Sequence, residues 1–231
     1  MTEPIAATAL DRRRVCALQA QMRRGSIARW DNTNWNGTDW VGKPRAVRIR
    51  WNFAPGVPDI FAPAINWAWE RWAEVCAIAP EYTPGADQVE VVYHLGDIDG
   101  PHGTLAWAEL PDGPDRTLKS RMDGEERWHF DPHTKPPAGK LHLGGVMCHE
   151  NGHLLGIEHD EDTGRALMDP TYGPDVLTPQ PLDIKQAVLR YGPAADVGRD
   201  APLNPATKKP VSIYLDGVVY HGEVTSAARG T

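Results

Sequence analysis

Alternating apolar and polar positions predict strands in the first half of the chain. Between Ala46 and Phe53 the apolar residues fall at every second position, and arginine or asparagine fills the positions between them. Such alternation is typical of a half-buried strand. The segments 89–95 and 104–110 predict two further strands. From Pro111 to Pro137 the composition is rich in Asp, Gly, Pro and Arg, and we expect a long surface loop there.

A helical period of apolar residues follows the first strand. Over 59–77 these residues recur three or four positions apart, which predicts an amphipathic helix with one face in the core. Asp59 suits the N-cap, and Pro63 falls in the first turn, where a missing N–H costs little. The residues expected to face the core are Ile65, Ala68, Trp69, Trp72 and Cys76, so Cys76 is interpreted as a buried thiol.

Two more helices are expected in the same domain. One covers about 143–155 and is broken at Gly156, which can adopt a positive φ. The other has Thr178 and Pro179 as its cap and first-turn residues and ends near Gly192. We expect the last helix to turn Leu182, Val188 and Leu189 towards the core.

The order of these elements predicts an α+β domain over 45–192, with an extension at each end. Residues 1–44 carry scattered arginines and three tryptophans and form an N-terminal extension, for which a pro-segment is one interpretation. Residues 193–231 begin with a linker rich in Pro, Ala and Lys. Two apolar runs joined by Asp216-Gly217 then predict a β-hairpin with a type I′ turn.

Composition and charge narrow the class of protein. The 231 residues include 24 Lys and Arg against 31 Asp and Glu, a net charge of −7, which argues against nucleic-acid binding through phosphate contacts. No apolar run approaches the roughly 20 residues of a membrane-spanning helix, and no secretory signal is visible at the N-terminus. The three widely spaced cysteines form neither a disulfide framework nor a CxxC metal motif. We therefore expect no nucleic-acid and no membrane partner.

The segment from His149 to His159 carries the candidate chemistry. His149 and His153 are four residues apart, so both imidazoles lie on one face of the expected helix and can reach one ion. Gly156 turns the chain back, and His159 then arrives from another direction. Three neutral imidazoles leave a fourth tetrahedral position for water, as in a catalytic zinc site. Glu150 is placed beside that water, where it can take up a proton.

A methionine follows nine residues after His159, within Leu167-Met168-Asp169-Pro170. Together with the zinc segment, this sequence resembles the metzincin clan of zinc endopeptidases, and within that clan the matrixins. The last expected helix, with Leu182-Asp183-Ile184 and Tyr191-Gly192, is similar to the matrixin C-terminal helix. The resemblance extends over roughly 45–192 and is most specific in 149–172.

The resemblance implies a metzincin-like catalytic domain with a small mixed twisted sheet, a long helix, an active-site helix, a Met-turn and a C-terminal helix. It implies one catalytic zinc held by His149, His153 and His159, with Glu150 as the catalytic base and Met168 in the Met-turn. The implied function is that of a monomeric zinc metalloendopeptidase that hydrolyses peptide bonds of a peptide or protein substrate. The implied substrate-binding residues are Leu105, Ala106, Pro170, Thr171 and Tyr172.

The sequence departs from the matrixin pattern at the second, structural zinc. The family's middle histidine falls at Trp107, which cannot ligate zinc, and we therefore expect that site to be absent. An alternative ligand set from His94, Asp97, His102 and His129 stays open, and so does calcium as an additional ion.

Cys16 and the place of action are further open points. In many matrixins a pro-segment cysteine caps the zinc, but Cys16 lacks the family's Pro-Arg-Cys-Gly context. It is interpreted as an ordinary helix residue, with a latch as the alternative. Family members are mostly exported, so extracellular action by a non-classical route is one expectation and cytoplasmic action the other. An astacin-like or other metzincin protease and a non-catalytic zinc-binding structural protein are the alternative functions.

Overall fold

The structure is a computed structural model. It describes residues 46–111, 117–160 and 165–194, together with two strands at 209–215 and 218–224. The chain divides into two compact units between Val197 and Gly198, and each is described by itself. The expectations for residues 1–44, including Cys16, and for the Asp216-Gly217 turn lie outside the described residues.

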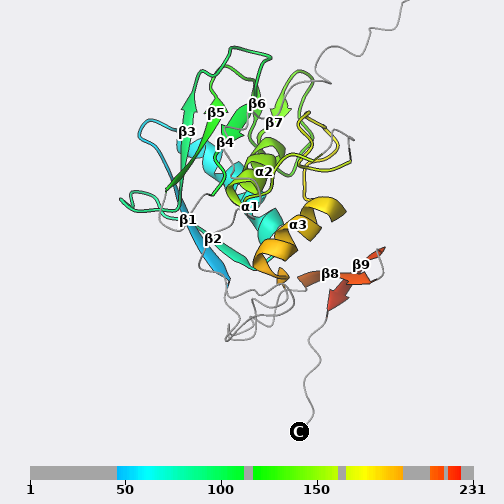
Figure 1. The fold of residues 1–231 in the computed structure, drawn as a ribbon. Helices are drawn as coiled ribbons and strands as arrows, with labels where there is room; N and C mark the ends of the chain where they lie inside the picture. Colours follow the sequence, from blue (N-terminus) through cyan, green and yellow to red (C-terminus); the bar gives the residue numbers. More distant parts are fainter. Residues whose placement is uncertain (1–45, 112–116, 161–164, 195–208, 216–217, 225–231) are drawn as a thin grey trace, which may run out of the picture. The chain divides into compact units, whose positions relative to one another are not determined.

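A five-stranded mixed sheet forms one layer of the first unit (Figure 1). The strands lie in the order β2-β1-β3-β5-β4, and all neighbours are parallel except β4, which runs antiparallel to β5. The short strands β6 and β7 form a separate parallel pair. The strands are β1 (Val47–Phe53), β2 (Ile78–Tyr82), β3 (Val91–Gly96), β4 (Ala106–Ala108), β5 (Leu118–Asp123), β6 (Trp128–His129) and β7 (Leu141–His142).

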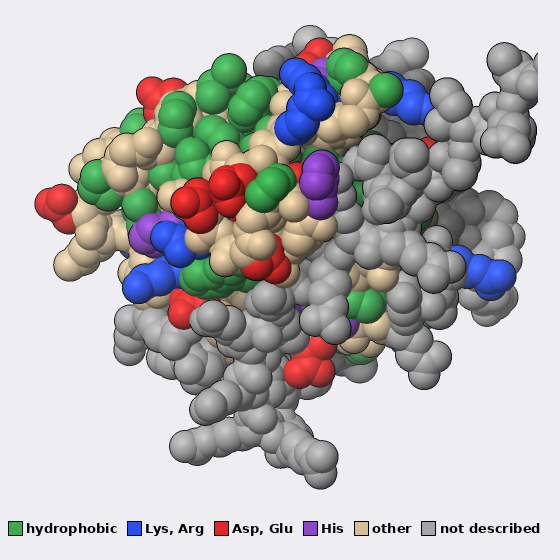
Figure 2. Space-filling model, turned by 90° about the horizontal axis from the view of Figure 1, so that it is seen from above, with side chains coloured by type: hydrophobic (Ala, Val, Ile, Leu, Met, Phe, Trp, Pro, Cys, Tyr) green, Lys and Arg blue, Asp and Glu red, His purple; other side chains and the backbone are tan. Residues whose placement is uncertain are grey.

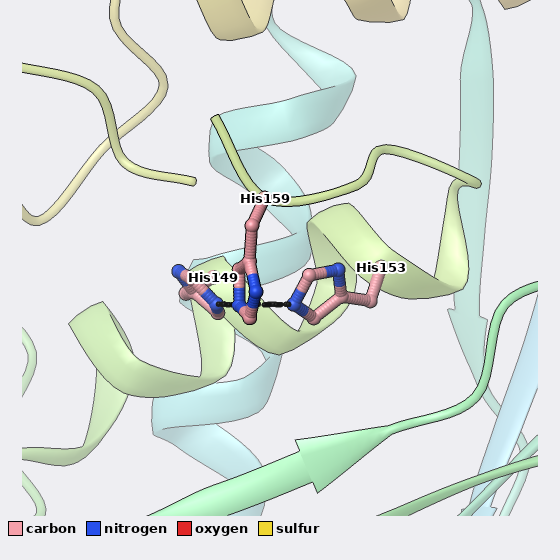
Figure 3. Close-up of side chains that lie close together, drawn as sticks. All are labelled: His149, His153 and His159. Carbon is pink, nitrogen blue, oxygen red and sulfur yellow. Dashed lines mark hydrogen bonds between the residues drawn. The ribbon is translucent and has the colours of Figure 1, made fainter. Parts of the chain in front are cut away.

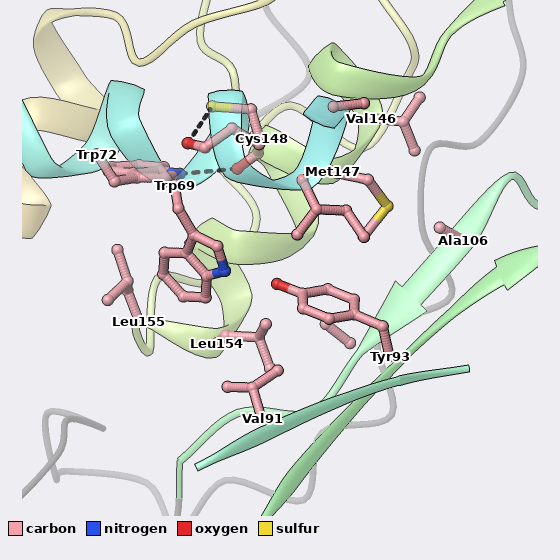
Figure 4. Close-up of a cluster of buried hydrophobic side chains, with 14 of the residues drawn as sticks. Trp69, Trp72, Val91, Tyr93, Ala106, Val146, Met147, Cys148, Leu154 and Leu155 are labelled. Atoms are coloured by element: carbon pink, nitrogen blue, oxygen red, sulfur yellow. Dashed lines mark hydrogen bonds between the residues drawn. The ribbon is translucent and has the colours of Figure 1, made fainter. Parts of the chain in front are cut away.

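Two helices, α1 (Ala62–Ala73) and α2 (Leu143–Leu154), pack against each other and form the core with the sheet. Trp69 and Trp72 of α1 are fully buried among Leu154 and Leu155 of the α2 end and side chains of β3 (Figure 4). The Trp72 indole N–H also donates to the Cys148 carbonyl oxygen at 2.8 Å. Truncation of a buried tryptophan side chain costs about 3–5 kcal/mol, so the packing of Trp69 and Trp72 holds α2 firmly in place.

The prediction of a long surface loop over 111–137 is wrong, because β5 lies inside the sheet between β3 and β4. Leu118, Ser120 and Met122 of β5 are buried, while Lys119 and Arg121 between them point away from the core. These charged residues make the alternation of buried and exposed positions in β5 difficult to recognise from the sequence. The sequence also did not predict the edge strand β2, because it contains Pro80 and Glu81. An edge strand tolerates proline because the N–H groups on its outer side donate no hydrogen bonds to a neighbouring strand. The two other predicted strands are confirmed as β3 and as the three-residue β4.

The helix predicted over 59–77 is shorter than expected. Residues Asp59–Phe61 form a 3₁₀ turn, η2, and Asp59 makes no N-cap hydrogen bond there. Helix α1 begins at Ala62, with Pro63 in its first turn, and ends at Ala73. Cys76 therefore lies beyond the helix, and it is buried as expected.

The last helix, α3 (Pro181–Tyr191), begins two residues after the predicted first-turn proline. Gln180 and Asp183 form a capping box in which each side chain accepts from the other's backbone N–H, and Pro181 is the first helical residue. The start of the helix does not decide which of its sides is buried. Leu182 and Leu189 are 52% and 46% exposed, so the prediction that they face the core is wrong, whereas Val188 is half-buried. The buried residues of α3 are Asp183, Ala187, Arg190 and Tyr191.

The second unit contains a two-stranded antiparallel sheet of β8 (Lys209–Leu215) and β9 (Val218–Val224). Leu215 pairs with Val218 across the turn, which confirms the predicted hairpin pairing. In the described parts of the chain, no helix is both long and apolar enough to cross a membrane.

Candidate metal centre

The helix that carries two of the candidate ligands is held at both ends. At its N-terminus the His142 side chain is the cap, because its Nδ1 accepts from the Gly145 N–H at 2.9 Å. Helix α2 ends after Leu154, and Gly156 then adopts a φ of 80°. A residue with a side chain is strained at that angle, so glycine allows the chain to reverse there. The reversal brings His159 back over the helix.

Three imidazole nitrogens meet at one point (Figure 3). The Nε2 atom of His153 lies 3.1 Å from Nε2 of His149 and 3.2 Å from Nε2 of His159. The remaining pair, His149 and His159, is 3.3 Å apart. The structure therefore brings together the three histidines that the sequence motif singled out.

Hydrogen bonds at the far nitrogens orient two of these rings. Nδ1 of His149 lies 2.7 Å from the Leu167 carbonyl oxygen, and Nδ1 of His153 lies 2.7 Å from the Ile157 carbonyl oxygen. A carbonyl oxygen only accepts, so each Nδ1 carries the proton and each Nε2 presents a lone pair. Burial lowers the pKa of His149 to about 3 and the pKa of His153 well below its usual value. Both rings are therefore neutral at physiological pH.

This donor set fits a zinc ion. Tetrahedral nitrogen ligands at 2.0–2.1 Å from a zinc ion are about 3.3–3.4 Å from one another, close to the spacings of 3.1–3.3 Å between the Nε2 atoms. Lone pairs that converge without a cation repel each other, whereas neutral imidazoles with their second N–H bonded to a carbonyl are typical zinc ligands. His149, His153 and His159 could hold the metal and leave its fourth position open.

The methionine turn lies beneath the helix. Met168 is buried, and a side chain at Gly152 of α2 would overlap its Sδ atom, so the turn and the helix touch where the helix has no side chain. Asp183 of α3 holds the turn from the other side. Its carboxylate accepts from the N–H groups of Leu167 at 2.8 Å and Met168 at 3.2 Å. The turn is thus fixed between two helices.

The candidate base, Glu150, is fully buried on α2 next to His149. Its negative charge acts on the Tyr93 hydroxyl: burial is the main cause that raises the pKa of Tyr93, and the charge of Glu150 adds to it. Tyr93 in turn donates to Asn151 Oδ1 at 2.6 Å. Strand β3 is thereby joined to the residue that follows Glu150.

A pocket opens beside His149, and it contains part of the expected substrate-binding set. Thr171 and Tyr172 line it, whereas Pro170 is not among its lining residues. Leu105 and Ala106 are fully buried around the start of β4. The pocket is lined by Gly145, His149, Ala166, Leu167, Asp169, Thr171, Tyr172, Gly173 and Val176.

Sequence reasoning missed four residues that shape this centre. His142 caps α2, Asp183 holds the methionine turn, and Gly145 and Val176 line the pocket. Of these four residues, only Asp183 could have been singled out from the sequence, because it lies three residues after Gln180, the spacing of a helix capping box. The other three depend on contacts between distant segments.

The alternative ligand set for a second metal does not gather in the described part of the chain. Metal-ligating groups occur there in two clusters of three, the histidines above and the carboxylates of Asp97, Asp123 and Glu125, whose oxygens lie within 4.8 Å of one another. Asp97 thus belongs with acidic residues, and His129 bonds Thr134 instead, at 2.9 Å between Nε2 and Oγ1. An acidic cluster of this kind is common without an ion and by itself assigns no calcium.

These features together define the metzincin class of metalloproteases. They are a helix with an HExxH motif packed against a mixed sheet, a third histidine after the reversal at a glycine, and a methionine turn beneath the helix. The sequence model of the matrixin peptidase family matches residues 61–188. The chain therefore belongs to the matrixin family of zinc metalloendopeptidases, as its sequence motif predicted.

Individual matrixin relatives agree with this assignment. The chain is 33% identical over 177 residues to an interstitial collagenase of Sus scrofa, a match that covers 72% of this chain and 33% of that protein. It is 33% identical over 131 residues to metalloendoproteinase 1 of Glycine max, covering 52% and 41%. A neutrophil collagenase of Homo sapiens is 29% identical over 212 residues, covering 85% and 40%. The chain spans about a third to two-fifths of the length of these curated relatives.

Proposed function

We propose that this protein is a zinc-dependent endopeptidase that hydrolyses peptide bonds within peptides or unfolded proteins. The observation that carries the proposal is the convergence of three imidazole Nε2 atoms at 3.1–3.3 Å, in a chain of the matrixin family. Two of these rings are buried and neutral, which is the state in which an imidazole binds a metal.

The roles of the side chains follow from their order on α2. When bound, a zinc ion would polarise the scissile carbonyl and lower the pKa of a water molecule at its open position. Glu150 accepts the proton of the attacking water and then delivers it to the leaving amine. Its burial favours the first of these two transfers, because a carboxylate in a low-dielectric site is a better proton acceptor than one in water.

The edge of the sheet offers a place for the substrate backbone. Strand β4 is the last strand in the order and pairs with β5 only, so its other edge has no strand partner among the described residues. An extended peptide can add to such an edge through main-chain hydrogen bonds. Helix α2 contacts β4, and this contact supports a scissile bond held near the three histidines.

Two variants separate this function from a purely structural zinc site. Glu150→Gln keeps the size of the side chain but cannot accept the proton. We expect it to retain one zinc per chain and to lose about 10²–10⁴-fold in the rate of casein hydrolysis, measured beside the wild type with and without a chelator. His159→Ala is the matched variant that should lose both zinc and activity. The proposal fails if zinc-loaded wild type cleaves neither casein nor a peptide library.

A further inference from the structure

A buried polar pair joins the sheet to the helix that carries the candidate base. Tyr93 of β3 and Asn151 of α2 are both fully buried, and the Tyr93 hydroxyl donates to Oδ1 of Asn151 at 2.6 Å. The Tyr93 ring points from the strand towards the helices, among apolar side chains such as Trp69 and Leu154 (Figure 4). In such surroundings no water competes for the hydrogen bond, so it holds its two groups in one arrangement.

The bond to Tyr93 is what holds the Asn151 side chain. The Nδ2 group of Asn151 is buried and has no hydrogen-bond partner among the described residues. A buried donor without a partner lowers stability, and leucine at this position would fill a similar volume without that cost. Buried polar groups of this kind can fix one arrangement of two elements at a cost in stability. The directional bond to the sheet is the feature that leucine would lack.

Glu150 lies between two anchored neighbours on α2. On one side, Nδ1 of His149 donates to the Leu167 carbonyl oxygen at 2.7 Å, and on the other side Asn151 accepts from Tyr93. Successive residues are about 100° apart around a helix, so the two bonds hold α2 from different directions and fix its rotation about its axis. The charge of Glu150 also adds to burial, the main cause, in raising the pKa of Tyr93, so the carboxylate is within electrostatic reach of the pair.

We infer that Tyr93 and Asn151 are positioning residues that orient Glu150 towards the attacking water. The inference rests on the proposed function. The anchor at His149 also serves metal binding, because His149 is a candidate ligand. The anchor at Asn151 has no such second task, so its removal leaves the three imidazoles in place and displaces the base. A misplacement of about 1 Å in a catalytic group can cost about 10²-fold in rate.

Kinetics per active site test this inference. Tyr93→Phe removes the hydroxyl and keeps the ring. We expect kcat for a peptide substrate to fall by about 10–100-fold. KM and the content of one zinc per chain should stay unchanged, because only the position of the base has been disturbed. Titration with a zinc-binding peptide hydroxamate counts the active sites, so a loss of folded protein is not mistaken for a loss of rate.

Tyr191→Phe is the matched control. Tyr191 is also fully buried, and its hydroxyl donates to the Leu155 carbonyl oxygen at 2.8 Å. The control therefore loses a buried tyrosine hydroxyl bonded to the end of α2, away from Glu150. It should lower stability to a similar extent and leave kcat per active site unchanged.

A double variant separates positioning from stability, and it also serves if Tyr93→Phe alone does not fold. Tyr93→Phe with Asn151→Leu replaces both polar groups by apolar ones of similar size, so the urea midpoint of the metal-free protein should recover. We expect kcat to stay low despite this recovery. A crystal structure of the metal-free double variant gives a reading that is independent of activity, in which the Glu150 carboxylate should be displaced from its wild-type position.

Three results would overturn the inference. They are a wild-type kcat in Tyr93→Phe, a kcat that recovers together with the urea midpoint in the double variant, and an unmoved Glu150 carboxylate in its crystal structure. A wild type that cleaves no peptide would instead refute the proposed function.

Discussion

Asp183 connects the last helix to the metal centre, and its replacement gives a quantitative prediction. The carboxylate is 2% exposed and accepts three backbone hydrogen bonds, from Leu167 at 2.8 Å, Met168 at 3.2 Å and Gln180 at 2.7 Å. The Leu167 carbonyl oxygen in turn accepts from Nδ1 of His149. Asp183 thus fixes the peptide segment that orients one zinc ligand.

Asp183→Asn removes one of these acceptors and the charge. If the amide oxygen replaces Oδ2, the bonds from Leu167 and Gln180 remain, but the amide NH₂ then faces the Met168 N–H. One charge-assisted buried hydrogen bond is worth about 1.5–3 kcal/mol, and the two that remain become neutral and weaker. The cheaper burial of a neutral amide offsets part of this loss. We expect a decrease of about 2–4 kcal/mol in the free energy of unfolding.

Two measurements on the same protein check the prediction. Urea unfolding gives the loss of stability, and competition with a chromophoric chelator gives zinc affinity, which should fall by about 10-fold or more because a group that orients a ligand has been disturbed. Leu182→Asn, at an exposed neighbouring position, should change stability by less than about 0.5 kcal/mol. Unchanged zinc affinity in Asp183→Asn would refute the link through Leu167.

Two further predictions concern the ends and the middle of α2. Burial lowers the pKa of His142, so the folded state binds fewer protons than the unfolded state. The neutral His142 ring therefore contributes stability that is fully present above the usual pKa of 6.5 and is lost as the pH falls through the lowered pKa. His142→Asn keeps a capping acceptor without a titrating group, so its free energy of unfolding should fall less than that of the wild type between pH 6.5 and 5. His142→Ala removes the cap and should lose about 1 kcal/mol of unfolding free energy at pH 7. Equal pH slopes for the wild type and His142→Asn would contradict this prediction. Gly152→Ala forces Met168 away from the helix and should cost about 1–3 kcal/mol in thermal or urea unfolding, with a smaller cost when Met168→Ala is already present; additive effects would show that the two residues do not touch.

The metal centre could be predicted from sequence because its main signals are local. The i, i+4 spacing of His149 and His153 is a property of any helix, and the reversal at Gly156 follows from the freedom of glycine. The structure shows Gly156 at a φ of 80° and the three Nε2 atoms together. The Leu177 side chain lies directly against Gly145 of α2, and this contact could not be predicted in the same way because it depends on how the segment after the methionine turn folds back.

The sheet was harder to predict than the helices because burial depends on distant partners. Strand β5 has charged residues at alternate positions and lies in a polar segment, yet its position between β3 and β4 buries Leu118, Ser120 and Met122. The face of α3 was wrongly predicted because its buried side contains the polar residues Asp183 and Arg190 beside Ala187 and Tyr191. Leu182 lies about 100° around the helix from the buried Asp183 and is exposed, as is Leu189 in the last turn.

X-ray absorption at the zinc edge tests the central claim most directly. The measurement is made on the zinc-loaded wild type and on His159→Ala. We predict one zinc per chain, with three imidazole nitrogens and one oxygen at about 2.0–2.1 Å in the wild type, and one imidazole fewer or no bound zinc in the variant. A shell with sulfur ligands, with fewer than three imidazoles in the wild type, or with no change in His159→Ala would contradict the account.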